Sequence, residues 1–205
     1  MEIEIKPKEG SRDKFQIVID DEIWGEIHTS VFGRKPFLPQ ALQSLNEWEA
    51  DFYILEHKLA KTYALRCLAR KSYSEAELSK KMQEKAISKP NIQKIIKDLK
   101  EYGYINDSQW IDSFLRQKAP NYGPRAIANK LYAKGFSKEK IHEALEKLQD
   151  NGDQNADIQK LLKTRYRNRD LSNSKERQKV IGSLIRKGFE FNHIISVLNK
   201  ASIVN

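Results

Sequence analysis

Three stretches of this chain repeat one another without a gap, and this repetition constrains the fold more than any other feature. They span residues 78–99, 127–148 and 180–201. Their apolar positions coincide in five sets: Leu78, Ile127 and Val180; Met82, Leu131 and Leu184; Ile87, Phe136 and Phe189; Ile92, Ile141 and Ile194; and Ile96, Leu145 and Leu198. Units repeated at such a period bury their apolar faces mainly by stacking on neighbours, so the sequence predicts a tandem array. An array offers a long surface, which suits a long partner.

The first 45 residues have a different period. Apolar and polar residues alternate near 2–5 and 23–27, and 15–19 is β-branched, with turn residues between these segments. This pattern predicts three short strands in a small antiparallel sheet. Such a sheet needs a cover. Apolar residues recur at helical steps after Pro39 and predict a helix that covers the sheet: Leu42, Leu45, Trp48, Phe52, Leu55 and Leu59. The pattern leaves open whether one bent helix or two run from 40 to 70.

Helix start and stop signals divide the remainder into groups of three. Ser74 to Glu77 matches a capping box, and Gly123-Pro124 marks a helix start. Gly135 predicts a left-handed helix end, and Gly188 predicts a helix stop. We expect the remaining helix caps at Asp107, Ser137 and Ser174.

These signals predict a mainly α fold, in which three tandem three-helix, helix-turn-helix-like repeats form an elongated curved array behind the N-terminal β region. We expect the β region, which leads into a helix, over residues 1–45. The repeats are expected over 46–105, 106–150 and 151–205, with a hinge in the loop 149–155 around Gly152.

Charge is unevenly distributed along the 205 residues, whose net charge is +9. Residues 1–60 hold 7 Lys and Arg against 12 Asp and Glu, a net −5, whereas 61–205 hold 30 against 16, a net +14. The basic excess therefore lies on the repeats. It predicts a polyanionic partner, either nucleic acid or an acidic groove on a protein. The alternative is a solvated lysine-rich face.

Neither a membrane span nor a signal peptide is evident, so we expect a cytoplasmic protein that does not bind membranes. The single cysteine, Cys67, excludes an internal disulfide framework, and its apolar neighbours predict a buried position in a helix seam.

Three basic clusters are the candidate binding residues. The first comprises Arg66, Arg70, Lys71, Lys80, Lys81 and Lys85; the second Arg116, Lys118, Arg125, Lys130 and Lys134; and the third Lys163, Arg165, Arg167, Arg169, Lys175, Arg177, Lys179, Arg186 and Lys187. Alternate residues of 163–169 cannot share one helical face, so this run is expected to splay around a helix end and its loop, where arginine suits phosphates. A solvated helix C-terminus is the alternative. Tyr73, Tyr122 and Tyr166 are candidates for stacking on bases.

Base-specific readout is weakly supported, because the helix starts after Ser74, Gly123 and Ser174 lack repeated Arg, Asn or Gln. Enzyme motifs fail as well. The segment 182–188 has the wrong spacing for a phosphate-binding loop. At 142–146, Glu146 stands where a zinc helix needs a second histidine, which favours a surface pair of His142 and Glu146. We expect no enzyme, no metal and no cofactor.

The chain resembles the RecX family, the bacterial regulators of the RecA recombinase. The resemblance runs from about Asp13 to the end and rests on motifs in a fixed order: Ala64-Leu65 with Leu68 and Arg70; Ser74-Glu-Ala-Glu-Leu78; Leu99 with Tyr102-Gly-Tyr-Ile-Asn-Asp107; Phe114 with Arg116; Gly123-Pro124-Arg125-Ala-Ile127; and Leu131 with Lys134-Gly135-Phe136.

The resemblance implies a regulator of recombination, DNA repair and the SOS response that lies in the RecA filament groove and binds nearby single-stranded and double-stranded DNA. It implies modulation, inhibition more than assistance, of ATPase, strand exchange and coprotease activity. We expect a monomer. The alternative from the residues alone is a general DNA-binding module without a recombinase partner.

Overall fold

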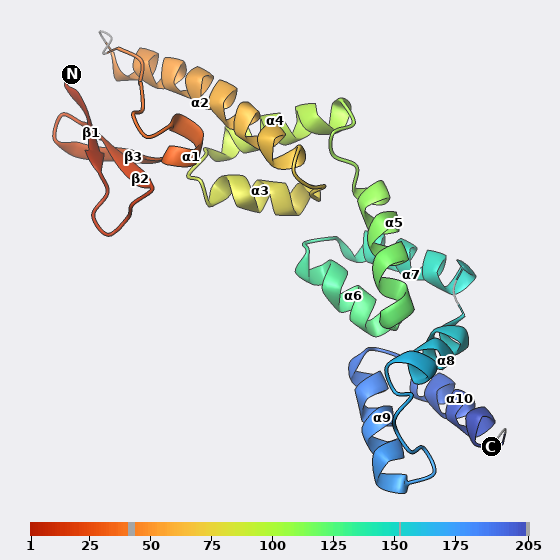
Figure 1. Ribbon diagram of the computed structural model, residues 1–205. Coiled ribbons are helices and arrows are strands. Elements are labelled where there is room, and N and C mark those ends of the chain that lie inside the picture. Colours follow the sequence, from red (N-terminus) through yellow and green to blue (C-terminus); the bar gives the residue numbers. More distant parts are fainter. Residues whose placement is uncertain (41–43, 152, 204–205) are drawn as a thin grey trace. The chain divides into compact units, whose positions relative to one another are not determined.

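The computed structural model describes residues 1–40, 44–151 and 153–203. The chain forms two compact units, Met1–Asp107 and Ser108–Asn205 (Figure 1). The described part holds a small sheet, ten α-helices and one short 3-10 helix, which confirms the predicted mainly α fold with an N-terminal antiparallel β region.

Three strands form the predicted antiparallel meander in the order β1-β2-β3. They are β1 (Ile3–Pro7), β2 (Lys14–Ile19) and β3 (Glu22–His28). The register pairs Ile5 with Ile17 and Phe15 with Ile27. Both Asp20 and Asp21 have positive φ, 48° and 67°. Asp tolerates this conformation better than most residues, so the two-residue turn between β2 and β3 forms there.

A single helix, α2 (Leu45–Leu68), covers the sheet after the short helix α1 (Thr29–Phe32). Trp24 of β3 packs edge-on against Trp48 and Phe52 of α2, with ring centroids 5.0 and 4.9 Å apart. The prediction was wrong for Leu45, which is 42% exposed because it lies in the first turn of the helix, outside the core. Leu42 lies outside the described residues.

The first repeat consists of α2, α3 (Glu75–Gln83) and α4 (Lys89–Glu101). Its repeated apolar side chains are all buried, and so is Cys67, as expected. The capping box at Ser74 and Glu77 is formed. Where the other repeats have Gly135 and Gly188, this one has Ala86 in the left-handed conformation, with φ of 57°.

A buried carboxylate that the sequence did not reveal joins α2 to α4. Glu56 is 2% exposed and accepts hydrogen bonds from the Ser88 backbone N–H (3.1 Å), the Ser88 hydroxyl and Asn91 Nδ2 (2.6 Å). Ser88 is the N-cap of α4 and makes no side-chain cap of its own. Glu56, which lies on α2, therefore supplies the hydrogen-bond acceptor at the start of α4.

The second repeat consists of α5 (Asp107–Lys118), the 3-10 helix η1 (Ala119–Asn121), α6 (Pro124–Ala133) and α7 (Lys138–Asn151). Gly135 ends α6 with φ of 83°, as predicted. Trp110 and Phe114 stack on each other with centroids 5.3 Å apart and pack against this core. Asp107 is the first residue of α5, and its Oδ1 accepts from the backbone N–H of Glu75 on α3 at 3.0 Å.

The third repeat consists of α8 (Gln154–Thr164), α9 (Ser174–Arg186) and α10 (Phe191–Ile203). The predicted cap at Ser174 was wrong. Asn173 is the N-cap of α9, and its Oδ1 accepts from the backbone N–H groups of Lys175 and Glu176, which places Ser174 inside the helix. The predicted loop 149–155 is mostly helical, since α7 ends at Asn151 and α8 begins at Gln154. Gly152 lies outside the described residues.

Among the described helices, none is both long and apolar enough to cross a membrane.

Candidate polyanion-binding surface

The arginine run of the third cluster surrounds the end of α8. Arg165 is the C-cap of α8, and Arg167 and Arg169 lie in the following turn. All three side chains are exposed. Within the described part of the chain, the side chains of Arg165 and Arg167 have no hydrogen bond or ion pair. Their guanidinium groups are therefore available to an anionic partner.

Other cations of the third cluster have polar partners within the third repeat. Glu176 accepts from Arg169 Nη1 at 2.7 Å and from Lys179 Nζ at 2.8 Å, and the Lys179 hydrogen bond, followed by that of Arg169, lowers the pKa of Glu176. Arg177 Nη2 donates to Asn199 Oδ1 at 2.7 Å. Exposed ion pairs are weak in water, so a phosphate can replace Glu176 as a partner at small cost.

Tyr166 is not a stacking residue, contrary to the prediction. It is 8% exposed in the core of the third repeat, and its hydroxyl lies 2.7 Å from Ser183 Oγ. The chain turns after Arg165, so the ring points inward between exposed arginines on both sides. An aromatic residue that fills a core and satisfies its hydroxyl leaves no face for a base.

The second and third clusters meet at Tyr122. The Nζ atoms of Lys130 and Lys187 lie 4.4 and 4.7 Å from the centre of its half-buried ring. Of the other members of the second cluster, Arg116 and Arg125 are exposed, and Lys118 and Lys134 are half-buried. Arg116 Nη2 donates to Ser113 Oγ at 3.0 Å.

In the first cluster, several cations contact other residues of their own unit. Arg66 Nη2 donates to the backbone oxygen of Ser30 at 3.0 Å, and Lys71 Nζ lies 4.3 Å from the ring centre of Tyr73. Arg70 and Lys80 are exposed, and Lys81 is half-buried.

Lys85 completes the first cluster and lies 3.0 Å from His28 Nε2. Burial, followed by the charge of Lys85, lowers the pKa of His28. Lys85, Lys134 and Lys187 hold the same position in the three repeats, next to the left-handed residue.

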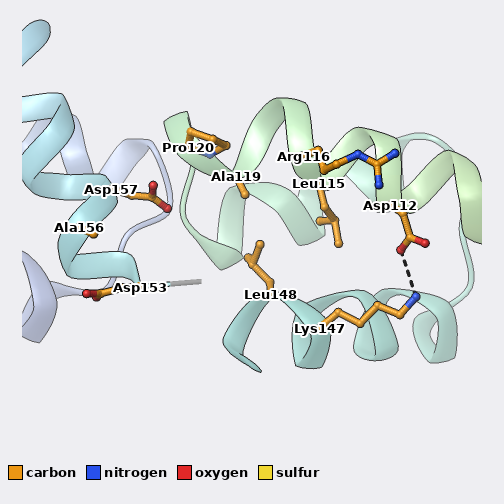
Figure 2. A pocket seen from close by; sticks show the side chains of 10 residues that line it. All are labelled: Asp112, Leu115, Arg116, Ala119, Pro120, Lys147, Leu148, Asp153, Ala156 and Asp157. Atoms are coloured by element: carbon orange, nitrogen blue, oxygen red, sulfur yellow. Dashed lines mark hydrogen bonds and ion pairs between the residues drawn. The ribbon is translucent and has the colours of Figure 1, made fainter. Parts of the chain in front are cut away.

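A cavity of about 460 Å³ in the second unit differs in character from the basic clusters (Figure 2). Its floor is apolar, from Leu115 and Leu148. The ion pair of Asp112 with Lys147, at 3.0 Å, lies at one end, and Asp157, whose pKa is raised by burial, lies at the other. Arg116 of the second cluster also lines this cavity, but the mixed charge and the apolar floor do not favour a polyanion there.

His142 Nε2 lies 3.2 Å from Glu146 Oε1, and both side chains are exposed on α7, which is the surface pair that the sequence favoured. Within the described residues, no group of three or more His, Cys, Asp or Glu side chains could hold a metal ion.

The fold and these clusters define a class of protein, namely a tandem array of three-helix units with basic side chains on its surface. Family profiles described as RecX, first three-helix domain, and RecX, third three-helix domain, match residues 60–99 and 153–198. The regulatory protein RecX of Caldanaerobacter subterraneus subsp. tengcongensis is 30% identical over 146 residues, which are 71% of this chain and 72% of that protein. This chain belongs to the RecX family of regulatory proteins.

Two solved structures share the fold. A crystal structure of regulatory protein RecX superposes with a TM-score of 0.63 at 22% identity and covers 96% of this chain and 98% of that one. A crystal structure of RecX from Lactobacillus salivarius gives a TM-score of 0.60 at 23% identity, over 72% of this chain and 97% of that one.

Proposed function

We propose that this protein is a non-enzymatic regulator that binds, as a monomer, in the groove of the RecA filament and to nearby DNA. It inhibits the ATPase, strand-exchange and SOS-type coprotease activities of RecA. Family membership supports the regulatory role, and the resemblance of the sequence motifs to those of the RecX family implies RecA as the partner. The observation that carries the proposal is the basic surface of the repeats, in which Arg165 and Arg167 are exposed and have no side-chain partner among the residues that the structure describes.

Electrostatic attraction explains how such a surface acts. Exposed cations on several repeats steer the protein to an anionic groove and fix its orientation, and they contribute less at high salt.

The second candidate is a general DNA-binding module that competes for the strand. The same two arginines favour it, because guanidinium groups bind backbone phosphates without reading sequence.

The ATPase of RecA on single-stranded DNA separates the two candidates. Protein is added far below the concentration of DNA sites. Strong inhibition at this ratio supports action on the filament, because one bound molecule affects many subunits. Inhibition that begins only when protein saturates the DNA would instead establish simple competition.

A charge-matched pair of variants tests the surface. Replacing Arg165, Arg167 and Arg169 by Ala removes three cations from the third cluster. Replacing Arg12, Arg34 and Lys35 by Ala removes three exposed cations from the acidic N-terminal region. We expect the first variant alone to lose inhibition, with both unfolding near the wild-type temperature. Equal effects on inhibition would show that net charge, not this cluster, determines binding.

A further inference from the structure

Two glycines bring the second and third repeats into backbone contact. A Cβ atom at Gly123 would lie 2.3 Å from the carbonyl oxygen of Gly188, and one at Gly188 would lie 2.3 Å from the backbone nitrogen of Ala126. Such distances are impossible for real atoms, and the obstructing atoms are backbone, which cannot rotate away. The start of α6 and the end of α9 therefore touch only because both residues are glycine (Figure 1).

Glycine is required at position 123 for this contact and not for the backbone conformation at that position. Its φ of −74° and ψ of 171° suit any residue, and helix N-caps favour Ser, Thr, Asp and Asn. Gly188 has a second reason to be glycine, since its φ is 86°. Gly123 is consequently the residue at which the contact can be tested without straining the backbone.

Further interactions stabilise the same joint, which we define as residues 121–123 and Ala126 with residues 187–188. The backbone N–H of Gly123 donates to the carbonyl of Lys187 at 2.9 Å, and Lys187 Nζ donates to the carbonyl of Asn121 at 3.2 Å. Lys187 also lies over the ring of Tyr122, as does Lys130. Both repeats thus contribute to one small, well-bonded contact, which fixes their relative placement.

Because the joint is fixed, the backbone positions that carry cations on either side of it are fixed relative to each other as well. Arg125 and Arg186 are exposed next to the joint, one from each repeat. A surface with fixed cations loses little entropy on binding a partner whose anions are also fixed, whereas a flexible strand can follow the cations wherever they lie.

We propose that the second and third repeats act as one rigid binding surface, and that the Gly123–Gly188 joint selects a partner with anionic groups in fixed positions, the nucleoprotein filament, over a free strand. This inference rests on the proposed function, of which it specifies the partner.

The test is Gly123→Ala, with Gly182→Ala as its control. Gly182 lies within α9, and a Cβ there would make an ordinary 3.5 Å contact with Arg186 Nη1. In a Cys67→Ala background, spin labels on the exposed positions Tyr132→Cys and Gln178→Cys report the distance between α6 and α9. Wild type and Gly182→Ala should give one narrow distance distribution, and Gly123→Ala a broad one.

Function is read in two assays. We expect Gly123→Ala to need at least tenfold more protein for half-inhibition of RecA ATPase, while its affinity for a single-stranded oligonucleotide stays within twofold of wild type. An unchanged distance distribution, unchanged inhibition, or an equal loss in both assays would overturn the inference. If wild type itself fails to inhibit RecA, the proposed function fails, and the distance measurement still decides whether the joint exists.

Lys187→Gln supplies the test if Gly123→Ala does not fold. Lys175→Gln is its charge-matched control, because Lys175 is exposed in the same cluster and lies outside the joint. We expect Lys187→Gln to broaden the label distance and to weaken inhibition several-fold more than Lys175→Gln. Equal behaviour of the two variants would refute a role for the joint.

Discussion

Ala86 has a backbone conformation that glycine provides in the other two repeats. Its φ is 57°, against 83° for Gly135 and 86° for Gly188. The left-handed conformation brings Cβ close to the following carbonyl oxygen, so alanine is strained there. The first repeat is thus folded with a residue that its own turn disfavours.

We expect Ala86→Gly to stabilise the first unit by about 0.5–1 kcal/mol, because relief of this strain exceeds the added entropy of the unfolded chain. Denaturant unfolding measures the change. The control is Ala76→Gly within α3, where the same exchange should destabilise by about 1 kcal/mol. A loss of stability in both variants would contradict our interpretation of Ala86.

Lys61 and Asp98 join α2 to α4 through an ion pair with 2.8 Å between Nζ and Oδ2. Their hydrogen bond lowers the pKa of Asp98 below its ordinary value of 3.8 and raises the pKa of Lys61 above 10.5. The contribution of Asp98 is therefore present above pH 3.8 and lost as pH falls through its folded value. That of Lys61 is present below pH 10.5 and lost as pH rises above it.

Asp98→Asn should therefore destabilise the protein at neutral pH, and the difference from wild type should shrink as the pH falls below 3.8 and through the lowered pKa of Asp98 in the folded protein. Thermal unfolding across this range checks the effect. Glu101→Gln, which removes an exposed pair at 3.9 Å from Lys97, serves as control. A difference that persisted unchanged at acid pH would show that the charge of Asp98 is not involved.

At the scale of the element, the sequence predicted apolar faces and helix ends better than helix starts. The repeated apolar positions and the stops at Gly135 and Gly188 depend on local pattern and backbone preference. Asn173 and Ser174 are both good capping residues. Which of them caps α9 depends on which has the extended backbone conformation of an N-cap, and in the structure this is Asn173. Glu56 could not be found in this way, because its partner Ser88 lies 32 residues away.

We expect Asn173→Ala to lower the free energy of unfolding by about 1 kcal/mol, since it removes a hydrogen-bond acceptor for two backbone N–H groups of α9. Ser174→Ala at the first helical position should change it little. Denaturant unfolding of the two variants compares them directly. A larger loss of unfolding free energy in Ser174→Ala than in Asn173→Ala would show that Ser174 is the cap.

For the whole molecule, composition predicted where the basic charge lies, but not which cations are available. Counting charges cannot show that Arg169 and Lys179 share Glu176, or that Tyr166 points into the core between the exposed Arg165 and Arg167. The sequence predicts a helix start at Gly123, and Gly123 is the N-cap of α6. Its contact with Gly188, 65 residues later, leaves no local signal in the sequence.

Binding to single-stranded DNA should weaken steeply with salt, because each phosphate contact releases about 0.7 of a counterion. If Arg165, Arg167 and Arg169 each bind a phosphate, replacing all three by Ala should reduce the slope of log affinity against log salt by about 2. Fluorescence anisotropy at several salt concentrations measures it, with the Arg12, Arg34 and Lys35 variant as control. An unchanged slope would place the phosphates elsewhere.

Asp107 shows where this chain could be divided. The residue opens α5 of the second repeat, yet its carboxylate binds the first backbone N–H of α3 in the first repeat. A segment excised or duplicated at the repeat boundary between 105 and 106 would leave α3 without this acceptor, whereas a cut after Asp107 would retain it. Duplication or recombination of whole repeats would therefore tolerate a breakpoint after Asp107 and not one before it. The first repeat that can be copied intact thus ends at 107, two residues beyond the predicted repeat boundary at 105.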